Sequence, residues 1–233
     1  MKRIFLIGNG PSLADTPLDM LIGEDTFAMN NIHRIYDKTD WRPKYYLRID
    51  HNPRNPGWVE QTIPNLKVVE HAWLWEAMKD GLPKNHPSHA DMPRGVGSWD
   101  NVTWIPRCEK HHYYASDNYQ KRGESWHLPT ICTAFSGMYP MLQIAALKGY
   151  DIIYLLGCDL KYQADKTKNH FVPDYIPFET GDISKERTRN NVWLHKVSRL
   201  SCPVPIVNLT PDSALDVYPH KTLEEALDYA FAL

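Results

Sequence analysis

The chain has 233 residues and a mass of 27.0 kDa, enough for one full α/β domain with a sizeable core. Apolar residues make up 42% of the sequence, which excludes a disordered chain. The formal net charge of −2 excludes a globally basic nucleic-acid-binding protein, although a local basic patch is compatible with it.

The first predicted element is a buried parallel strand over residues 4–7, followed at once by the turn Gly8-Asn9-Gly10-Pro11-Ser12. Glycines let a main chain approach a ligand closely, and a strand that feeds such a turn is typical of a nucleotide site. The turn matches neither GxGxxG nor GxxxxGK[ST], so neither the dinucleotide nor the P-loop mechanism follows from it. A tight turn without a ligand is the alternative.

Further strands are predicted over residues 25–31, 45–50, 66–70, 151–156 and 205–209. Helices are predicted over residues 138–147, 186–200 and 223–231; Gly149 ends the first, and Thr222 with Glu225 caps the last. Several strands run into polar or glycine residues: Asn30 and Asn31, Asp50 and Asn52, Gly157 and Asp159. Because ligands bind beyond the carboxyl ends of parallel strands, we expect these residues to converge on a nucleotide. Amides suit ribose hydroxyls and base edges, since they both donate and accept.

These elements predict one α/β domain over residues 1–233, Rossmann-like, with a mainly parallel sheet and helices on both faces. Residues 72–130 are rich in aromatic residues, proline and glycine and have weak periodicity, which indicates an irregular lid-like insertion. A second lid loop is expected at about residues 160–185.

The loop after Asp159 holds the candidate catalytic residues. His170 is the natural general base, because its reference pKa lies near working pH. Asp174 would orient His170 or replace it as the base. Lys161 or Tyr162 would neutralise a leaving phosphate, helped by the start of a helix at Ser136 and Gly137. A structural or solvated role is the alternative for each of these residues.

Five segments carry a family resemblance: IGNGPSL at 7–13, FAMNN at 27–31, FSGMYPMLQIAALKGYDIIYLLGCDL at 135–160, NHF at 169–171 and NLTPDSAL at 208–215. Together they resemble the bacterial lipooligosaccharide sialyltransferase family. Its wider relatives include uncharacterised phage and bacterial glycosyltransferases and hydroxymethylpterin diphosphokinase-like proteins. Residues 55–130 show no such resemblance.

The resemblance implies a single Rossmann-like domain with a lid that binds a cytidine-linked sugar without metal. It implies donor contacts from Gly8, Asn9, Gly10, Ser12, Asn30, Ser136 and Gly137. Where that family has two tyrosines for the donor phosphate, this chain has Lys161 at the first position, followed by Tyr162. Where it has the base histidine, four residues after the histidine of NHF, this chain has Asp174. The base is therefore His170 or Asp174, and the sugar need not be sialic acid.

The sequence thus predicts a metal-independent, inverting glycosyltransferase that uses a nucleotide-linked sugar, with a CMP-sugar favoured and no cofactor. The acceptor would be a glycan, a lipid-linked sugar or, for a phage-borne gene, a modified DNA base. One alternative is a Mg²⁺-dependent pyrophosphokinase acting on a hydroxymethylpterin, with Asp50 and Asp159 as metal ligands. The other is a non-catalytic nucleotide-binding module.

We expect a cytoplasmic protein, because no apolar run is long enough to span a membrane and the chain starts without a signal peptide. Its four cysteines lack CxxC spacing, which favours a reducing compartment and argues against zinc. Both a monomer and a homo-oligomer are compatible with the sequence.

Overall fold

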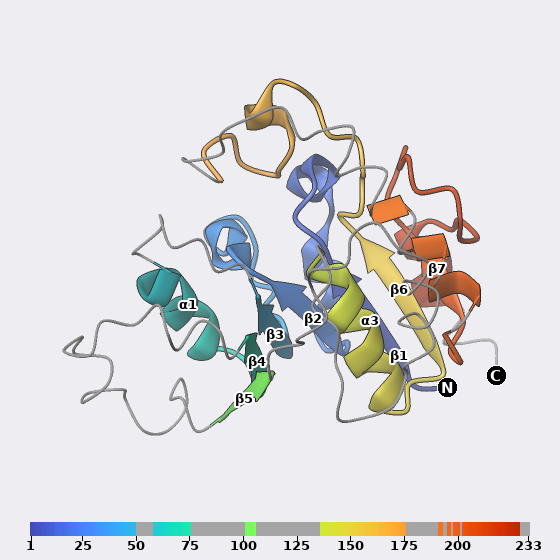
Figure 1. The fold of residues 1–233 in the computed structure, drawn as a ribbon, viewed down its shortest axis with the longest axis horizontal. Helices are drawn as coiled ribbons and strands as arrows, with labels where there is room; N and C mark the ends of the chain where they lie inside the picture. Colours follow the sequence, from blue (N-terminus) through green and yellow to red (C-terminus); the bar gives the residue numbers. More distant parts are fainter. Residues whose placement is uncertain are drawn as a thin grey trace, which may run out of the picture.

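A computed structural model describes residues 1–49, 58–75, 101–105, 136–175, 191–192, 195–196, 198–200 and 202–228. Its centre is one seven-stranded sheet in the order β5-β4-β3-β2-β1-β6-β7, and all neighbouring strands are parallel (Figure 1). The strands are β1 (Arg3–Ile7), β2 (Thr26–Met29), β3 (Tyr45–Arg48), β4 (His71–Trp75), β5 (Val102–Ile105), β6 (Ile152–Leu156) and β7 (Ile206–Asn208).

Three α-helices and four 3₁₀-helices have defined bounds in the described part of the chain. The α-helices are α1 (Trp58–Leu66), α3 (Met138–Leu147) and α5 (Leu223–Asp228). The 3₁₀-helices are η1 (Pro11–Asp15), η2 (Leu18–Leu21), η3 (Ile32–Ile35) and η7 (Lys166–Lys168). None of the helices in these residues is both long enough and apolar enough to cross a membrane.

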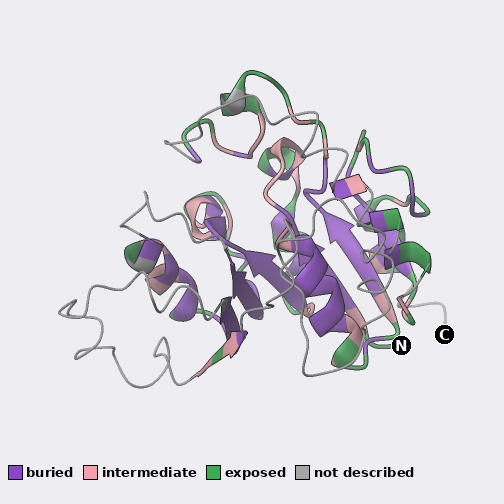
Figure 2. Cartoon of the chain, viewed as in Figure 1, coloured by how far each residue is buried: buried purple, intermediate pink, exposed green. Residues whose placement is uncertain are grey.

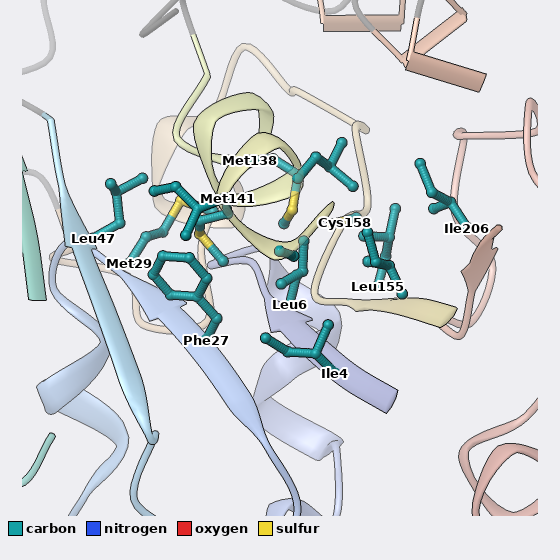
Figure 3. Close-up of a cluster of buried hydrophobic side chains, with 14 of the residues drawn as sticks. Ile4, Leu6, Phe27, Met29, Leu47, Met138, Met141, Leu155, Cys158 and Ile206 are labelled. Carbon is teal, nitrogen blue, oxygen red and sulfur yellow. The ribbon is translucent and has the colours of Figure 1, made fainter. Parts of the chain in front are cut away.

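Alternate side chains of each strand enter two separate cores, because successive residues of a strand point to opposite faces. Ile4 and Leu6 of β1, with Phe27 and Met29 of β2, pack in one core with Met141 of α3 (Figure 3). The second core lies on the other face. Its members come from β1, β2, β3, β4, β6 and β7 and from η1, η2, η3, α1, α5 and residues 171–175. Figure 2 shows β1, β2, β6 and most of α3 as buried, whereas β5 at the end of the sheet is partly exposed.

The strand order reverses at β1: β2 to β5 follow on one side of it, and β6 and β7 follow on the other. Strand β1 pairs with β2 on one side and with β6 on the other, and the register aligns Ile7 with Ala28 and with Leu156. The carboxyl ends of β1, β2 and β6 therefore lie side by side, at the position where open α/β sheets bind ligands. Residues 160–175 lie beyond these strand ends, as the orange segment of Figure 1 shows.

The predicted fold class is confirmed: a parallel α/β sheet with helices on both faces. The helix over residues 138–147 begins and ends as predicted, and Gly149 has the left-handed φ of +72° expected after its end. The capping box also forms, since the Thr222 N–H donates to Glu225 Oε2 (2.8 Å) and the Glu225 N–H to Thr222 Oγ1 (3.1 Å). In the predicted helix over residues 186–200, the described residues are helical.

One predicted strand is wrong, and two observed strands fall where none was expected. Residues 66–70 form the end of α1 and a turn, in which the Val68 and Val69 N–H groups donate to Asn65 O. The strand follows at His71–Trp75, with β5 beside it at Val102–Ile105, so at least these parts of residues 72–130 belong to the sheet. Residues 76–100 and 106–130 of the predicted insertion lie outside the described residues.

Candidate functional site

Two glycine turns pack against each other at the carboxyl ends of β1 and β6. The Gly8 N–H donates to Leu156 O over 2.7 Å. The Gly10 N–H donates to Gly157 O over 2.9 Å. A Cβ atom on Gly157, which has a φ of +65°, would lie 2.7 Å from Gly8 O, and a Cβ on Gly8 would overlap Gly157 O. Packing between the two turns therefore requires these glycines, whether or not a ligand approaches them.

Asp159 follows the second turn and anchors the first. Its carboxylate is buried; Oδ1 accepts from the Ser12 N–H (3.1 Å) and Oδ2 from the Ser12 hydroxyl (2.8 Å). Burial raises the pKa of Asp159, and the two hydrogen bonds from Ser12 partly oppose this rise. Both oxygens of Asp159 thus accept hydrogen bonds from the start of η1, so Ser12 and Asp159 hold the two turns together.

Asn9 connects three parts of the chain. Its side-chain Nδ2 donates to Met29 O (3.1 Å), at the end of β2. Its backbone oxygen accepts from the Phe171 N–H (3.2 Å) and from His170 Nδ1 (3.3 Å). Its side-chain Oδ1 is buried and has no hydrogen-bond partner among the described residues. Buried amide oxygens are normally satisfied, so this atom is a candidate acceptor for a donor group of a ligand.

His170 is held by a hydrogen bond to Asn9 O and by stacking on Tyr175. A carbonyl oxygen only accepts, so Nδ1 carries the proton and Nε2 is the basic nitrogen of the neutral ring. The ring stacks on Tyr175 with centroids 4.2 Å apart and an interplanar angle of 21°. The Nε2 atom is buried, so a substrate hydroxyl reaches it only after the chain around it moves. Phe171 and Tyr175 are themselves buried in the second core, so this part of the expected lid is packed into the fold.

Asp174 forms an ion pair with Arg34. Within the part of the chain that the structure describes, no hydrogen bond joins Asp174 to His170. The Arg34 Nη2 atom lies 2.6 Å from Asp174 Oδ2, and Nη1 donates to Asp174 O over 2.7 Å. The hydrogen bond from Arg34 lowers the pKa of Asp174, whose side chain is 75% exposed. A carboxylate stabilised in its charged form is a weak base, which favours His170 over Asp174.

The ends of β2 and β3 are joined through Asn31. Its N–H donates to the Tyr175 hydroxyl (3.1 Å), and its Oδ1 accepts from Arg48 Nη1 (3.0 Å). Asn30 precedes it with a left-handed φ of +51°, and Asn30 O accepts from the Tyr46 hydroxyl (2.8 Å). Both asparagines are buried, and these hydrogen bonds fix the strand ends and the segment 171–175.

The start of α3 lies over the end of β2, where a Cβ on Gly137 would come 2.5 Å from Met29 Sδ. Its first N–H groups are partly used by Ser136, which precedes the helix. The Met138 N–H donates to Ser136 Oγ (3.3 Å) and the Tyr139 N–H to Ser136 O (3.2 Å), and residue 140 is a proline without an N–H. Fewer N–H groups are therefore left for a phosphate than a helix N-terminus usually offers.

The two residues expected to stabilise a leaving phosphate lie on the loop after β6. Lys161 is exposed, and its charge lowers the pKa of Asp159 against the effect of burial. The Tyr162 hydroxyl accepts a hydrogen bond from Asn191 Nδ2 (3.1 Å). Asp50 and Asn52 lie outside the described residues.

Comparisons with known proteins place the fold. No protein-family model and no curated protein matches the chain. Among solved structures the chain is similar to the MAf glycosyltransferase from Magnetospirillum magneticum AMB-1, with a TM-score of 0.50 and 13% sequence identity. The match covers 98% of this chain but only 36% of that one, so the chain spans about a third of that protein. At this identity the likeness concerns the fold, and the resemblance to sialyltransferases stays a prediction.

Two residues of this region were missed from the sequence, namely Arg48 and Tyr175. Arg48 ends an otherwise apolar strand, and an arginine at that position of a buried strand was the available signal. Tyr175 had no signal, because its role depends on contact with Asn31, 144 residues away. Among the described residues, no three His, Cys, Asp or Glu side chains gather closely enough to hold a metal ion.

Proposed function

We propose that the chain is a glycosyltransferase that uses a nucleotide-linked sugar. The observation that carries this proposal is the position of His170. It is held by Asn9 at the end of β1, where the two halves of a parallel α/β sheet diverge. The likeness in fold to the MAf glycosyltransferase supports the reaction class.

In the proposed reaction an acceptor hydroxyl attacks the anomeric carbon of the donor as the bond from that carbon to the phosphate oxygen breaks. The nucleotide leaves with the electron pair of the broken bond, and the configuration at the anomeric carbon is inverted. His170 Nε2 takes the proton of the acceptor hydroxyl. His170 is preferred over Asp174 because the pairing with Arg34 lowers the pKa of Asp174. Lys161, Tyr162 and the Gly137 N–H are the groups proposed to stabilise the developing charge.

We propose a CMP-sugar as the donor, on the resemblance of the sequence motifs, and a reaction that needs no metal. The acceptor is a glycan, a lipid-linked sugar or a modified DNA base. Asn9 Oδ1 and the strand-end amides are the groups proposed to recognise the nucleoside, since amides pair with both donors and acceptors.

The first experiment screens CMP, UDP, GDP and ADP for thermal stabilisation, with EDTA and with Mg²⁺, because a ligand that binds the folded state raises Tm. The second measures release of nucleotide from the matching nucleotide sugar in EDTA, with water as the acceptor. Release in EDTA supports the proposal. Strict Mg²⁺ dependence with ATP and a hydroxymethylpterin would indicate the pyrophosphokinase, and binding without turnover would indicate a binding module.

The base is tested with matched histidine variants. His170→Ala should lower turnover by roughly 10²–10⁴-fold with little change in nucleotide binding. The control is His220→Ala, because His220 also places a ring nitrogen on a backbone oxygen (Leu215 O, 3.1 Å) but lies beside β7. Asp174→Asn should keep most of the turnover. Equal turnover in the His170 and His220 variants would reject His170 as the base.

A further inference from the structure

Arg48 is a buried cation at the carboxyl end of β3, and only 2% of its surface is exposed. Its guanidinium donates to two side-chain amides: Nη1 to Asn31 Oδ1 (3.0 Å) and Nη2 to Gln61 Oε1 (2.8 Å). Its Nε atom is buried and has no acceptor among the described residues. A guanidinium carries more N–H donors than these two oxygens use.

No charge in the described structure neutralises Arg48. Both of its acceptors are uncharged amides, and no carboxylate of the described residues forms an ion pair with it. The neighbouring cation, Arg34, is already paired with Asp174 at 2.6 Å. A charge removed from water without a partner is costly, and in proteins such charges pair or bind a ligand.

His33 lies near enough to Arg48 to feel its charge. Burial first, and then the charges of Arg48 and Arg34, lower the pKa of His33 to about 4. His33 is therefore neutral at physiological pH and adds no second cation. It supplies no negative charge either, so the guanidinium still lacks a counter-ion.

We propose that Arg48 binds an oxyanion of the ligand, either a phosphate or the carboxylate of an acidic sugar. This inference rests on the proposed function only in taking the ligand to be a nucleotide-linked sugar. β3 lies two strands from β1, which is about 10 Å across a sheet. Arg48 therefore meets a part of the ligand distant from the turn at Gly8, and an extended ligand that spans both positions fits this separation.

The test measures binding of small anions by thermal shift and calorimetry, without any assay of turnover. The probes are inorganic pyrophosphate for the phosphate source and free N-acetylneuraminate for the carboxylate source. The tighter probe identifies the source. Arg48→Gln should weaken that probe by about tenfold to a hundredfold, the range for a charge-assisted hydrogen bond. Arg48→Lys should bind the probe with an affinity between those of the parent protein and Arg48→Gln, because lysine keeps the charge but lacks the planar guanidinium.

Gln61→Glu is a second variant that leaves Arg48 intact. It replaces the acceptor 2.8 Å from Arg48 Nη2 by a carboxylate, so the protein supplies its own counter-ion. We expect a higher Tm without ligand and at least tenfold weaker binding of the probe. A purely structural Arg48 would leave the affinity for the probe unchanged.

Arg42→Gln is the matched control. Arg42 precedes the same strand, donates to the backbone oxygens of Thr39 and Trp41, and lies over the Tyr36 ring. Its removal should leave the affinity unchanged. The proposal is overturned if the parent protein binds neither probe, or if Arg48→Gln and Gln61→Glu both bind with parental affinity. If the parent protein binds a probe, Arg48→Gln loses that binding, and the parent transfers no sugar, then the proposed function is rejected but this inference stands.

Discussion

Replacing Gly157 by alanine tests whether contact between the two turns, rather than backbone conformation, requires a glycine there. Gly149 provides a matched control, because the two glycines have similar left-handed φ values of +65° and +72°. A Cβ on Gly149 would meet nothing within 4 Å, whereas one on Gly157 would lie 2.7 Å from the Gly8 backbone oxygen.

The expected free energies follow from these two environments. Left-handed backbone costs an alanine about 1–2 kcal/mol, and the stiffer unfolded chain returns about 0.4–1 kcal/mol. Gly149→Ala should therefore cost roughly 0.5–1 kcal/mol. Gly157→Ala adds overpacking against a backbone atom that cannot rotate away, about 1–3 kcal/mol, for a total of roughly 2–4 kcal/mol.

Urea unfolding followed by circular dichroism measures the difference directly. For a chain of this size, a gap of about 2 kcal/mol corresponds to roughly 4–8 °C in Tm. Gly8→Ala should be destabilised as well, because its Cβ would overlap Gly157 O from the other side. Equal losses of stability in Gly157→Ala and Gly149→Ala would refute the reasoning, since only the clash distinguishes them.

Three more predictions concern buried polar groups. Burial lowers the pKa of His195 to about 4. The free energy of unfolding should therefore be highest above pH 6.5 and fall by about 3 kcal/mol between pH 6.5 and 4, because the unfolded state takes up the proton first. His195→Gln should flatten this part of the pH–stability curve. Asn31→Ala removes an acceptor of Arg48 and the side-chain donor to Tyr175 O (3.4 Å), and should lower the free energy of unfolding by roughly 1–3 kcal/mol. Amide exchange in residues 171–175 should become faster. Unchanged exchange would show that Tyr175 is anchored without the Asn31 side chain. Cys158 is buried and its thiol pKa is raised by burial, so mass spectrometry should find it unmodified by an aromatic disulfide reagent in the native protein and modified in urea; labelling of the folded chain would contradict its burial.

The sequence predicted well the elements that neighbouring residues specify by themselves. The strands of the sheet centre are continuous apolar runs, as strands buried on both faces must be, and the α3 boundaries follow from glycines before and after it. The segment 66–70 misled because Val68 and Val69 favour strands locally, whereas Asn65 O accepts both of their N–H groups and holds them in a turn. The strand begins one residue later, at His71.

The sequence predicted that several polar strand ends converge, but it did not predict the contacts that their residues make. Gly8, Asn9, Asn30 and His170 do meet at one edge of the sheet, because parallel strands end there together. The pairing of Ser12 with Asp159 could not be predicted, since the two residues are 147 positions apart and each resembles an ordinary ligand-binding residue. Arg48 became a candidate ligand-binding residue only after its burial and its uncharged partners were known, and neither can be read from the sequence.

The pairing of β1 with β6 also has a consequence for synthesis of the chain. Arg3 of β1 pairs with Ile152, and α3, which covers this part of the sheet, begins only at Met138. Until those residues have left the ribosome, β1 is an edge strand with one unpaired row of backbone groups and an uncovered apolar face. A fragment that ends before residue 136 should therefore aggregate, and the nascent chain should depend on chaperones until residue 156 has emerged and the sheet has closed on both sides of β1.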